Sequence, residues 1–287
     1  MKLVLFLAFV VGGSSVTAQP KLVSQVTINT TTNVIAPEEE DITSIQTQGQ
    51  GEGMAMFRNF GDGETKSVTQ VKNNLVKTVI KSDMGRSTII RNNETKMTTT
   101  LIEMMGNKTG FYASDDEQAA MRKSMDSMMQ ARSKDSAGRV NRPREIPKVE
   151  VIYSADTKKI AGYSCKKALI ISTRLLGLVK DTTIAWFTPD FKVKNVSSVG
   201  GGIATAFGAS SAPNPMELIE GFVLGYETKM RRNRTMIVEV TKVDLTKEIA
   251  EKEFDIPKDF DVKPMKEMRN MMGGAGQGNQ IQIRRGN

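Results

Sequence analysis

Apolar and polar residues alternate along most of this chain, which is the pattern of β-strands that have one buried face. The clearest examples are the segments 149–153, 163–172 and 222–240. Short runs rich in Asn, Gly and Arg separate the alternating segments and mark turns between neighbouring strands. The pattern predicts a mainly β (α+β) fold built on a curved antiparallel sheet with one solvated side.

The expected strands follow one another as hairpins. Val71, Asn73, Leu75, Lys77 and Val79 would share one face of a strand, so the stretch 71–79 predicts one continuous strand. Asn92 and Asn93 tolerate the left-handed conformation, so they predict a tight hairpin between strands at 86–91 and 95–102.

One segment has helical rather than strand periodicity. Ser114 can cap a helix, and the acidic residues at 115–117 suit its first turn. Methionines then recur at helical spacing, at Met121, Met125, Met128 and Met129. The pattern predicts one Met-rich amphipathic helix that ends near residue 133 and lies across one face of the sheet.

The first 18 residues have the pattern of a cleavable signal peptide. Lys2 provides a positive charge, residues 3–11 form an apolar run too short to span a bilayer, and Ala18 suits the cleavage site. No later apolar run approaches the roughly 20 residues that a transmembrane helix needs. We therefore expect export to the periplasm, the outer envelope or the extracellular space, with no stable membrane span.

The remaining chain is expected to form a single β-rich domain over residues 19–262. Polar segments that contain Pro or Gly predict loops at 134–148 and 200–215. Residues 263–287 are rich in Met, Gly, Gln and Arg, a composition that predicts a disordered basic tail.

The net charge of the chain is +8, and basic residues gather at 139–144, at 229–234 and in the tail. These clusters contain almost no aromatic residues, and the chain is expected to be exported, so we expect no nucleic-acid partner. Two interpretations of the charge remain: attraction to an anionic envelope surface, or ordinary solvated loops.

The chain contains no histidine and a single cysteine, Cys165. These counts exclude Ser-His-Asp and Cys-His nucleophile pairs, and zinc sites made from His or several Cys ligands. Ser164 and Lys167 match the S-x-x-K spacing of acyl-enzymes, but residues three apart on a strand face opposite sides. The sequence therefore predicts a protein that is not an enzyme, with no catalytic residue, no metal and no cofactor.

Cys165 itself has two interpretations. Lys166 and Lys167 would lower the pKa of its thiol if they lay close to it, which would make the thiol reactive. Alternatively, Cys165 is a small buried apolar residue on a strand.

The chain contains 18 methionines, and the Met-rich helix has three interpretations. Methionine packs adaptably in cores, it forms pliable surfaces for varied apolar ligands, and its thioether binds Cu(I). No histidine or second cysteine supports a copper site. Core packing and an apolar binding surface therefore both stay open.

Three motifs together resemble a known family. They are Gly162-Tyr-Ser-Cys-Lys-Lys167, then Ala185-Trp186-Phe187-Thr188, then Phe254-Asp-Ile-Pro257. This combination, over residues 50–262, resembles the exported Gram-negative bacterial family called domain of unknown function 4412. That family is similar in architecture to the periplasmic lipoprotein carriers LolA and LolB. The resemblance implies a strongly curved antiparallel sheet (a half-barrel) around helices, with an apolar cavity for a lipid-like ligand.

These observations favour an exported, non-catalytic cell-envelope domain that binds an apolar ligand in the concave face of the sheet. Met121, Met125 and Met128 would supply a pliable wall of the site. Trp186 or Phe187 would supply a rigid wall, and their alternation on one strand leaves open which of them points inward. The alternative is a structural or protein-interaction module whose core is filled by its own side chains.

One modification site is expected. Asp135-Ser136-Ala137 resembles the Asp-Ser/Thr acceptor of O-glycosylation in some exported Gram-negative proteins. Ser136 lies in the predicted 134–148 loop, where it would be exposed. It is therefore the glycosylation candidate.

Overall fold

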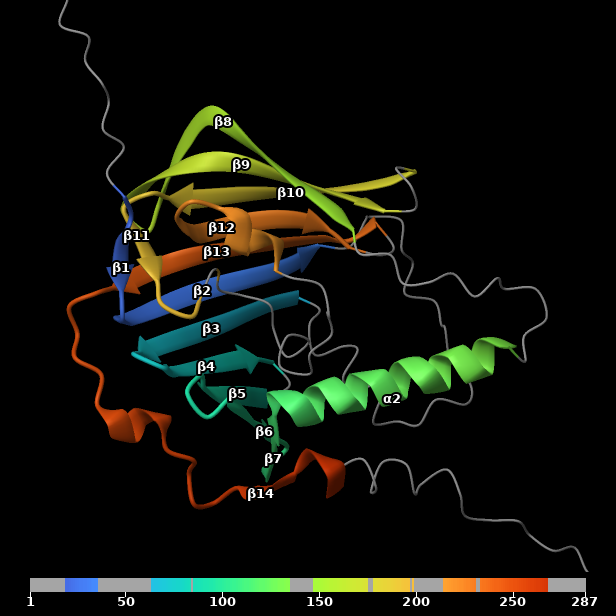
Figure 1. Ribbon diagram of the computed structural model, residues 1–287. Coiled ribbons are helices and arrows are strands. Elements are labelled where there is room, and N and C mark those ends of the chain that lie inside the picture. Colours follow the sequence, from blue (N-terminus) through green and yellow to red (C-terminus); the bar gives the residue numbers. More distant parts are fainter. Residues whose placement is uncertain are drawn as a thin grey trace, which may run out of the picture.

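The structure is a computed structural model dominated by one large β-sheet (Figure 1). The residues that it describes are 19–35, 63–83, 85–134, 147–174, 178–196, 198, 214–230 and 233–267. In the helix, the side chains at 125, 126 and 128–134 lie outside the description. The predicted signal peptide at 1–18, the loop 200–213 and Ser136 lie outside it too.

The elements are short strands joined mostly by tight turns. In chain order, the strands are β1 (Lys21–Val23), β2 (Gln25–Ile35), β3 (Gly63–Lys72), β4 (Leu75–Ser82), β5 (Gly85–Asn92), β6 (Met97–Met104), β7 (Asn107–Ser114), β8 (Lys148–Ile160), β9 (Tyr163–Arg174), β10 (Val179–Thr188), β11 (Phe191–Val193), β12 (Phe222–Lys229), β13 (Thr235–Asp244) and β14 (Asp261–Pro264). The helices are α2 (Asp115–Lys134) and the 3₁₀ turns η1 (Pro215–Leu218) and η3 (Glu251–Phe254).

Twelve strands form the main sheet, in the order β14-β7-β6-β5-β4-β3-β2-β13-β12-β10-β9-β8. Every neighbouring pair is antiparallel except β14 and β7, which are parallel. A separate parallel pair, β1 with β11, packs at one end. The prediction of a mainly β fold is confirmed. The prediction of a purely antiparallel sheet is wrong, because the C-terminal strand β14 runs parallel to its neighbour β7.

The register of the strands defines two faces of the sheet. One row of directly paired residues runs across β2 to β6 on the first face: Thr30, Ser67, Ile80, Ser87 and Ile102. We call this the helix face, because α2 and η1 pack on it through Met121, Met216 and Ile219. We call the opposite face the strap face, because residues 245–260 cross it.

The strap stays on its face through apolar anchors and lysine hydrogen bonds. Ile249 and Phe254 are buried against Ile90 and Leu101 of the sheet. Lys72 Nζ donates a 2.7 Å hydrogen bond to the carbonyl oxygen of Ile249. The strap therefore covers apolar residues of β5 and β6 that would otherwise meet water.

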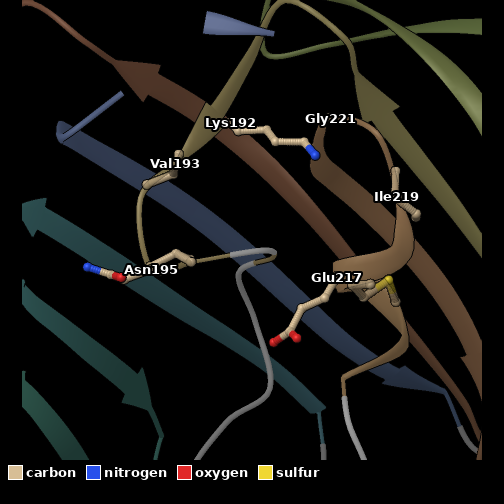
Figure 2. Close-up of a pocket in the computed structure, with 8 residues that line it drawn as sticks. Lys192, Val193, Asn195, Glu217, Ile219 and Gly221 are labelled. Carbon is tan, nitrogen blue, oxygen red and sulfur yellow. The ribbon is translucent and has the colours of Figure 1, made fainter. Parts of the chain in front are cut away.

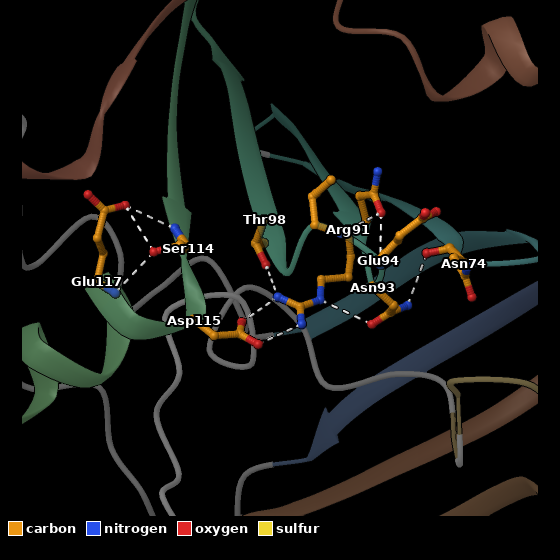
Figure 3. A network of polar contacts seen from close by, with 10 residues as sticks. Asn74, Arg91, Asn93, Glu94, Thr98, Ser114, Asp115 and Glu117 are labelled. Carbon is orange, nitrogen blue, oxygen red and sulfur yellow. Dashed lines mark hydrogen bonds and ion pairs between the residues drawn. The ribbon is translucent and has the colours of Figure 1, made fainter.

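The helix α2 begins directly after β7, and its start is fixed by a capping box (Figure 3). The backbone N–H of Ser114 donates to Glu117 Oε2 at 3.0 Å, and the N–H of Glu117 donates to Ser114 Oγ at 3.2 Å. Met121 packs against Ile102 and Phe111 of the helix face. In Figure 1, α2 starts at the end of β7 and extends away from that end of the sheet. That the helix lies across the concave face therefore stays a prediction.

The turn near Asn73 corrects one prediction. β3 ends at Lys72 and β4 begins at Leu75, so residues 71–79 are a hairpin and not one strand. Asn73 has the left-handed φ of 54° that a tight turn requires. The sequence did not reveal this turn because neither Gly nor Pro marks it.

The predicted tight hairpin at Asn92 and Asn93 is also different in the structure. β5 includes Asn92, β6 begins only at Met97, and a four-residue turn joins them. Asn92 Oδ1 accepts hydrogen bonds from the N–H groups of Glu94 and Thr95, at 2.9 and 3.2 Å. The Asn side chain therefore replaces a backbone acceptor and stabilises a longer turn.

Two further expectations need correction. The first is the expected solvated side of the sheet, which is interrupted at β12. The five residues from Phe222 to Tyr226 are all buried there, because β8 covers one face of the strand and η1 covers the other. The ordered domain also extends past residue 262, since β14 continues to Pro264 and Met265 is 6% exposed in the core. Among the described residues, no helix is long and apolar enough to cross a membrane.

Candidate functional site

Trp186 and Phe187 lie on opposite faces of β10. Phe187 belongs to the core of the helix face and is 4% exposed, with its ring 5.5 Å from that of Tyr153 in an edge contact. Trp186 lies on the other face, where Lys167 Nζ is 5.9 Å from the ring centroid. The two aromatic residues therefore cannot line the same site, and Phe187 is the one on the helix face.

Met121 lies on the same face as Phe187 but far from it. Met121 packs beside β6 and β7, whereas Phe187 belongs to β10. From β7 to β10 the sheet order has eight steps, which corresponds to on the order of 35–40 Å along the sheet. Met125 and Met128 have side chains outside the described part. The structure does not bring Met121 and Phe187 together.

A pocket of about 290 Å³ opens on the helix face between β11 and η1 (Figure 2). Its buried apolar lining comes from Val193, Met216 and Ile219, which are 5%, 9% and 2% exposed. Phe187 lies behind this wall in the same core cluster as Met216 and Ile219. The volume is just below the range of roughly 300–1,000 Å³ that is usual for small-molecule sites.

The rim of the pocket is polar. Lys192 and Asn195 stand on one side and Glu217 on the other (Figure 2). Asn195 Nδ2 donates a 3.3 Å hydrogen bond to the carbonyl oxygen of Asn73, so the rim is anchored to the turn between β3 and β4. The pocket thus combines an apolar interior with a few polar groups at its opening, which is the usual form of a small-molecule site.

The position of Gly221 keeps this part of the pocket compact. A Cβ at this position would lie 2.7 Å from Phe187 Cδ2 and would collide with the carbonyl oxygen of Thr188. Only a residue without a side chain lets the chain approach β10 so closely. Gly221 therefore links the pocket wall to the buried aromatic residue behind it.

Sequence reasoning missed Val193, Met216 and Ile219. A signal for η1 was present, because Asn214 followed by Pro215 is the start of a helical turn. Asn214 Oδ1 accepts a 3.1 Å hydrogen bond from the Met216 N–H in the structure. No local signal could show that β11 would face η1, since tertiary packing alone brings them together.

Cys165 is a core residue. It is 0% exposed, and its Sγ donates a weak 3.7 Å hydrogen bond to the carbonyl oxygen of Tyr163. Burial raises the pKa of the Cys165 thiol to about 11. The thiol is therefore neutral near pH 7, and the interpretation as a small buried apolar residue is confirmed.

Lys167 is held by a carboxylate. Its Nζ donates to Asp156 Oδ2 at 2.9 Å, and this hydrogen bond is the main reason why the pKa of Asp156 is lowered. Lys167 lies on the strap-face side of β9, while Ser164 has the opposite parity on the same strand. Within the described residues, no group of three or more His, Cys, Asp or Glu side chains could hold a metal ion.

Buried hydroxyl groups form the middle of the helix face. Thr30, Ser87 and Thr100 are 2%, 0% and 1% exposed, and their hydroxyl oxygens have no hydrogen-bond partner in the structure. Between them, Thr69 Oγ1 and Thr78 Oγ1 bond to each other at 3.1 Å. We call these five residues the hydroxyl strip; it crosses the sheet from β2 to β6.

One buried residue, Ile28, lies between the hydroxyl strip and a core cluster that reaches the pocket. Ile28 pairs directly with Thr69 of the strip. It also shares a core cluster with the pocket residue Val193, and Val196 packs against that cluster. Ile28 therefore connects the strip with the cluster that contains Val193, although no strip residue lines the pocket itself.

Comparison with known proteins gives no family. No family model matches the chain, and no curated protein matches it. Structures of PNGF-II in space groups C2 and P21 resemble it with TM-scores of 0.36 and 0.37 and 15% sequence identity, over 87% of this chain and 33% of PNGF-II. The chain thus spans about a third of the length of these structures. Likeness at this level carries no functional argument. Because no family model matches, the resemblance to domain of unknown function 4412 stays a prediction.

Proposed function

We propose that this chain is an exported, non-catalytic cell-envelope domain that binds an apolar, lipid-like ligand on the helix face of its sheet. The observation that carries the proposal is the pocket between β11 and η1, with its apolar interior and polar rim. The sequence predicted an apolar site in the concave face of the sheet with other lining residues, and the proposal now rests on this pocket instead.

The energetics of an acyl chain fit a small pocket. Each methylene removed from water contributes roughly 0.8 kcal/mol. Eight methylenes would offer about 6 kcal/mol before ordering costs. Micromolar affinity corresponds to about 8 kcal/mol, so it requires a preformed wall, which keeps ordering costs low, and further contacts of the ligand. Val193 and Ile219 supply such a wall, because both belong to buried core clusters of the sheet.

The proposal is tested by displacement of a fluorescent fatty-acid probe from the purified mature protein. Val196→Trp would fill the pocket, so this variant should lose probe binding. Leu218→Trp is the matched control, because Leu218 is 55% exposed on η1 and does not line the pocket. If wild type binds no acyl probe, the proposal fails.

A structural or protein-interaction role is the second candidate. The observation that favours it is the dense packing behind the pocket, where Phe187, Tyr226 and Val238 are all buried by other side chains. Under this alternative, Val196→Trp changes stability but no ligand affinity. Mass spectrometry of compounds that copurify with the native protein distinguishes the two roles.

Export is part of the proposal and has its own test. The signal-like residues 1–18 motivate it. Intact-mass analysis of protein from the envelope fraction should give a chain that begins at Gln19.

Binding to vesicles of anionic lipid, measured against neutral vesicles, tests the proposed attraction to an anionic envelope surface. Glycopeptide mapping around Ser136 tests the modification.

A further inference from the structure

From the hydroxyl strip, we infer that the ligand is a neutral amphiphile that carries hydrogen-bonding groups next to its acyl chain. This inference rests on the proposed function and names the chemical class of its ligand. It follows from three buried hydroxyl groups that have no partner and that gather on the face of the pocket.

The first step concerns the cost of these hydroxyl groups. A buried polar atom that loses its hydrogen bonds with water and gains none from the protein is destabilising. Such atoms are rare in folded proteins, and each one calls for a physical reason. In the described part of the chain, the unpartnered buried Ser and Thr oxygens belong to Thr27, Thr30, Ser87 and Thr100. Three of the four lie on the helix face, and Thr27 lies on the strap face.

The second step concerns their arrangement. Thr30 and Ser87 belong to one row of paired residues across the sheet. Thr100 belongs to the next row, in which it pairs with Ile89. Thr30 on β2 and Thr100 on β6 are four strand steps apart in the sheet order, or about 19 Å. An extended ligand with several polar atoms therefore fits the strip better than a compact ion.

The third step concerns charge. The two rows from β2 to β6 contain hydroxyl-bearing and aliphatic residues but no charged one: Thr30, Ser67, Ile80, Ser87 and Ile102 in the first, and Ile28, Thr69, Thr78, Ile89 and Thr100 in the second. A carboxylate or phosphate buried there would have no counter-charge within these rows, which is strongly unfavourable. Hydroxyl, ester or amide groups would instead exchange hydrogen bonds with Ser and Thr. The apolar pocket then takes the acyl chain.

The test compares 1-monooleoylglycerol with oleate, which has the same acyl chain and an ionised head. The full mature protein is first stripped of lipid. Wild type should bind monooleoylglycerol more tightly than oleate. Thr30→Val, Ser87→Ala and Thr100→Val should each weaken monooleoylglycerol binding about two- to tenfold, as expected for one net hydrogen bond.

The same variants have an opposite effect on the ligand-free protein. Each replaces an unpartnered hydroxyl by an apolar group of similar shape, so the midpoint of thermal unfolding should rise. Thr69→Val is the matched control, because it removes the 3.1 Å bond to Thr78 and should lower the midpoint. Single substitutions keep the test valid if a triple variant does not fold.

Three results would overturn the inference while leaving the proposed function intact. The first is equal monooleoylglycerol binding by wild type and all three variants, and the second is tighter binding of oleate. The third is a lower unfolding midpoint in Ser87→Ala and Thr100→Val, which would show that the hydroxyls have partners in the ligand-free protein. Failure of wild type to bind either probe would instead refute the proposed function itself.

Discussion

Lys158 on β8 donates to Glu239 on β13 with an Nζ–Oε2 distance of 2.6 Å, although β9, β10 and β12 lie between these two strands in the sheet order. The contact is possible only because this end of the sheet curls until β8 lies over β13. Both side chains are about half exposed, so the ion pair itself contributes little to stability. Apolar packing beneath it maintains the curl.

A substitution at Gly225 tests the packing of β8 against β12. A Cβ there would lie 3.3 Å from Ile160 Cδ1 and 3.2 Å from the carbonyl oxygen of Val238. Gly225→Val should therefore lower the free energy of unfolding by about 1–3 kcal/mol through overpacking. Chemical denaturation measures the change. Ile160→Ala in the Gly225→Val background should cost less than Ile160→Ala alone, and strict additivity would show that the two residues do not meet.

Local signals predicted much of this fold. The alternation in β13 agrees with the structure, because Val238 and Val240 are buried whereas Glu239 and Thr241 are exposed. The cap at Ser114 was visible because its hydroxyl and the carboxylate of Glu117 act on adjacent backbone groups. Interactions of short range along the chain leave a pattern in the sequence.

The parts that could not be predicted depend on distant segments. Trp186 and Phe187 are equally apolar neighbours, and only the packing of η1 on one face decides which of them joins the helix-face core. The pocket needs β11 and η1 to face each other, and neither segment carries a sign of its partner. The sequence therefore could not predict the pocket residues Val193, Met216 and Ile219, whose meeting depends on tertiary packing alone.

Arg91 and Asp115 join the sheet to the start of α2 (Figure 3). Arg91 Nη1 and Nη2 donate to the two carboxylate oxygens of Asp115, at 2.5 and 2.8 Å. Asp115 is 45% exposed, so solvent screening limits the contribution of this bidentate pair to about 1 kcal/mol. Arg91→Gln should lower the free energy of unfolding by that amount at pH 7.

The pH dependence of this effect follows from the pKa of Asp115. The hydrogen bonds from Arg91 are the main cause that lowers this pKa below the usual 3.8. The stabilisation is therefore present above pH 3.8 and is lost as the pH falls through the lower value in the folded protein. The difference between wild type and Arg91→Gln should shrink in acid, and a constant difference down to pH 2 would contradict the assignment.

The capping box predicts a position-specific serine effect. Ser114→Ala removes the acceptor of the Glu117 N–H and should cost about 1 kcal/mol. Ser127→Ala is the matched control, because Ser127 is exposed and its hydroxyl donates only to the carbonyl oxygen of Lys123 in the preceding turn. It should change stability by less than about 0.5 kcal/mol. Helical circular dichroism and urea denaturation measure both, and equal effects would contradict a role for the cap.

The last prediction concerns the thiol of Cys165. Because burial raises its pKa to about 11, roughly one thiol in a thousand is ionised at pH 8, and the sulfur is also shielded from solvent. Iodoacetamide should therefore leave the native protein unmodified for hours and should alkylate it within minutes in guanidinium chloride. Thr182→Cys in a Cys165→Ser background is the positive control, because residue 182 is exposed on β10. Intact-mass measurements follow the reaction, and rapid labelling of native wild type would show that the strands around Cys165 open far more readily than their packing implies.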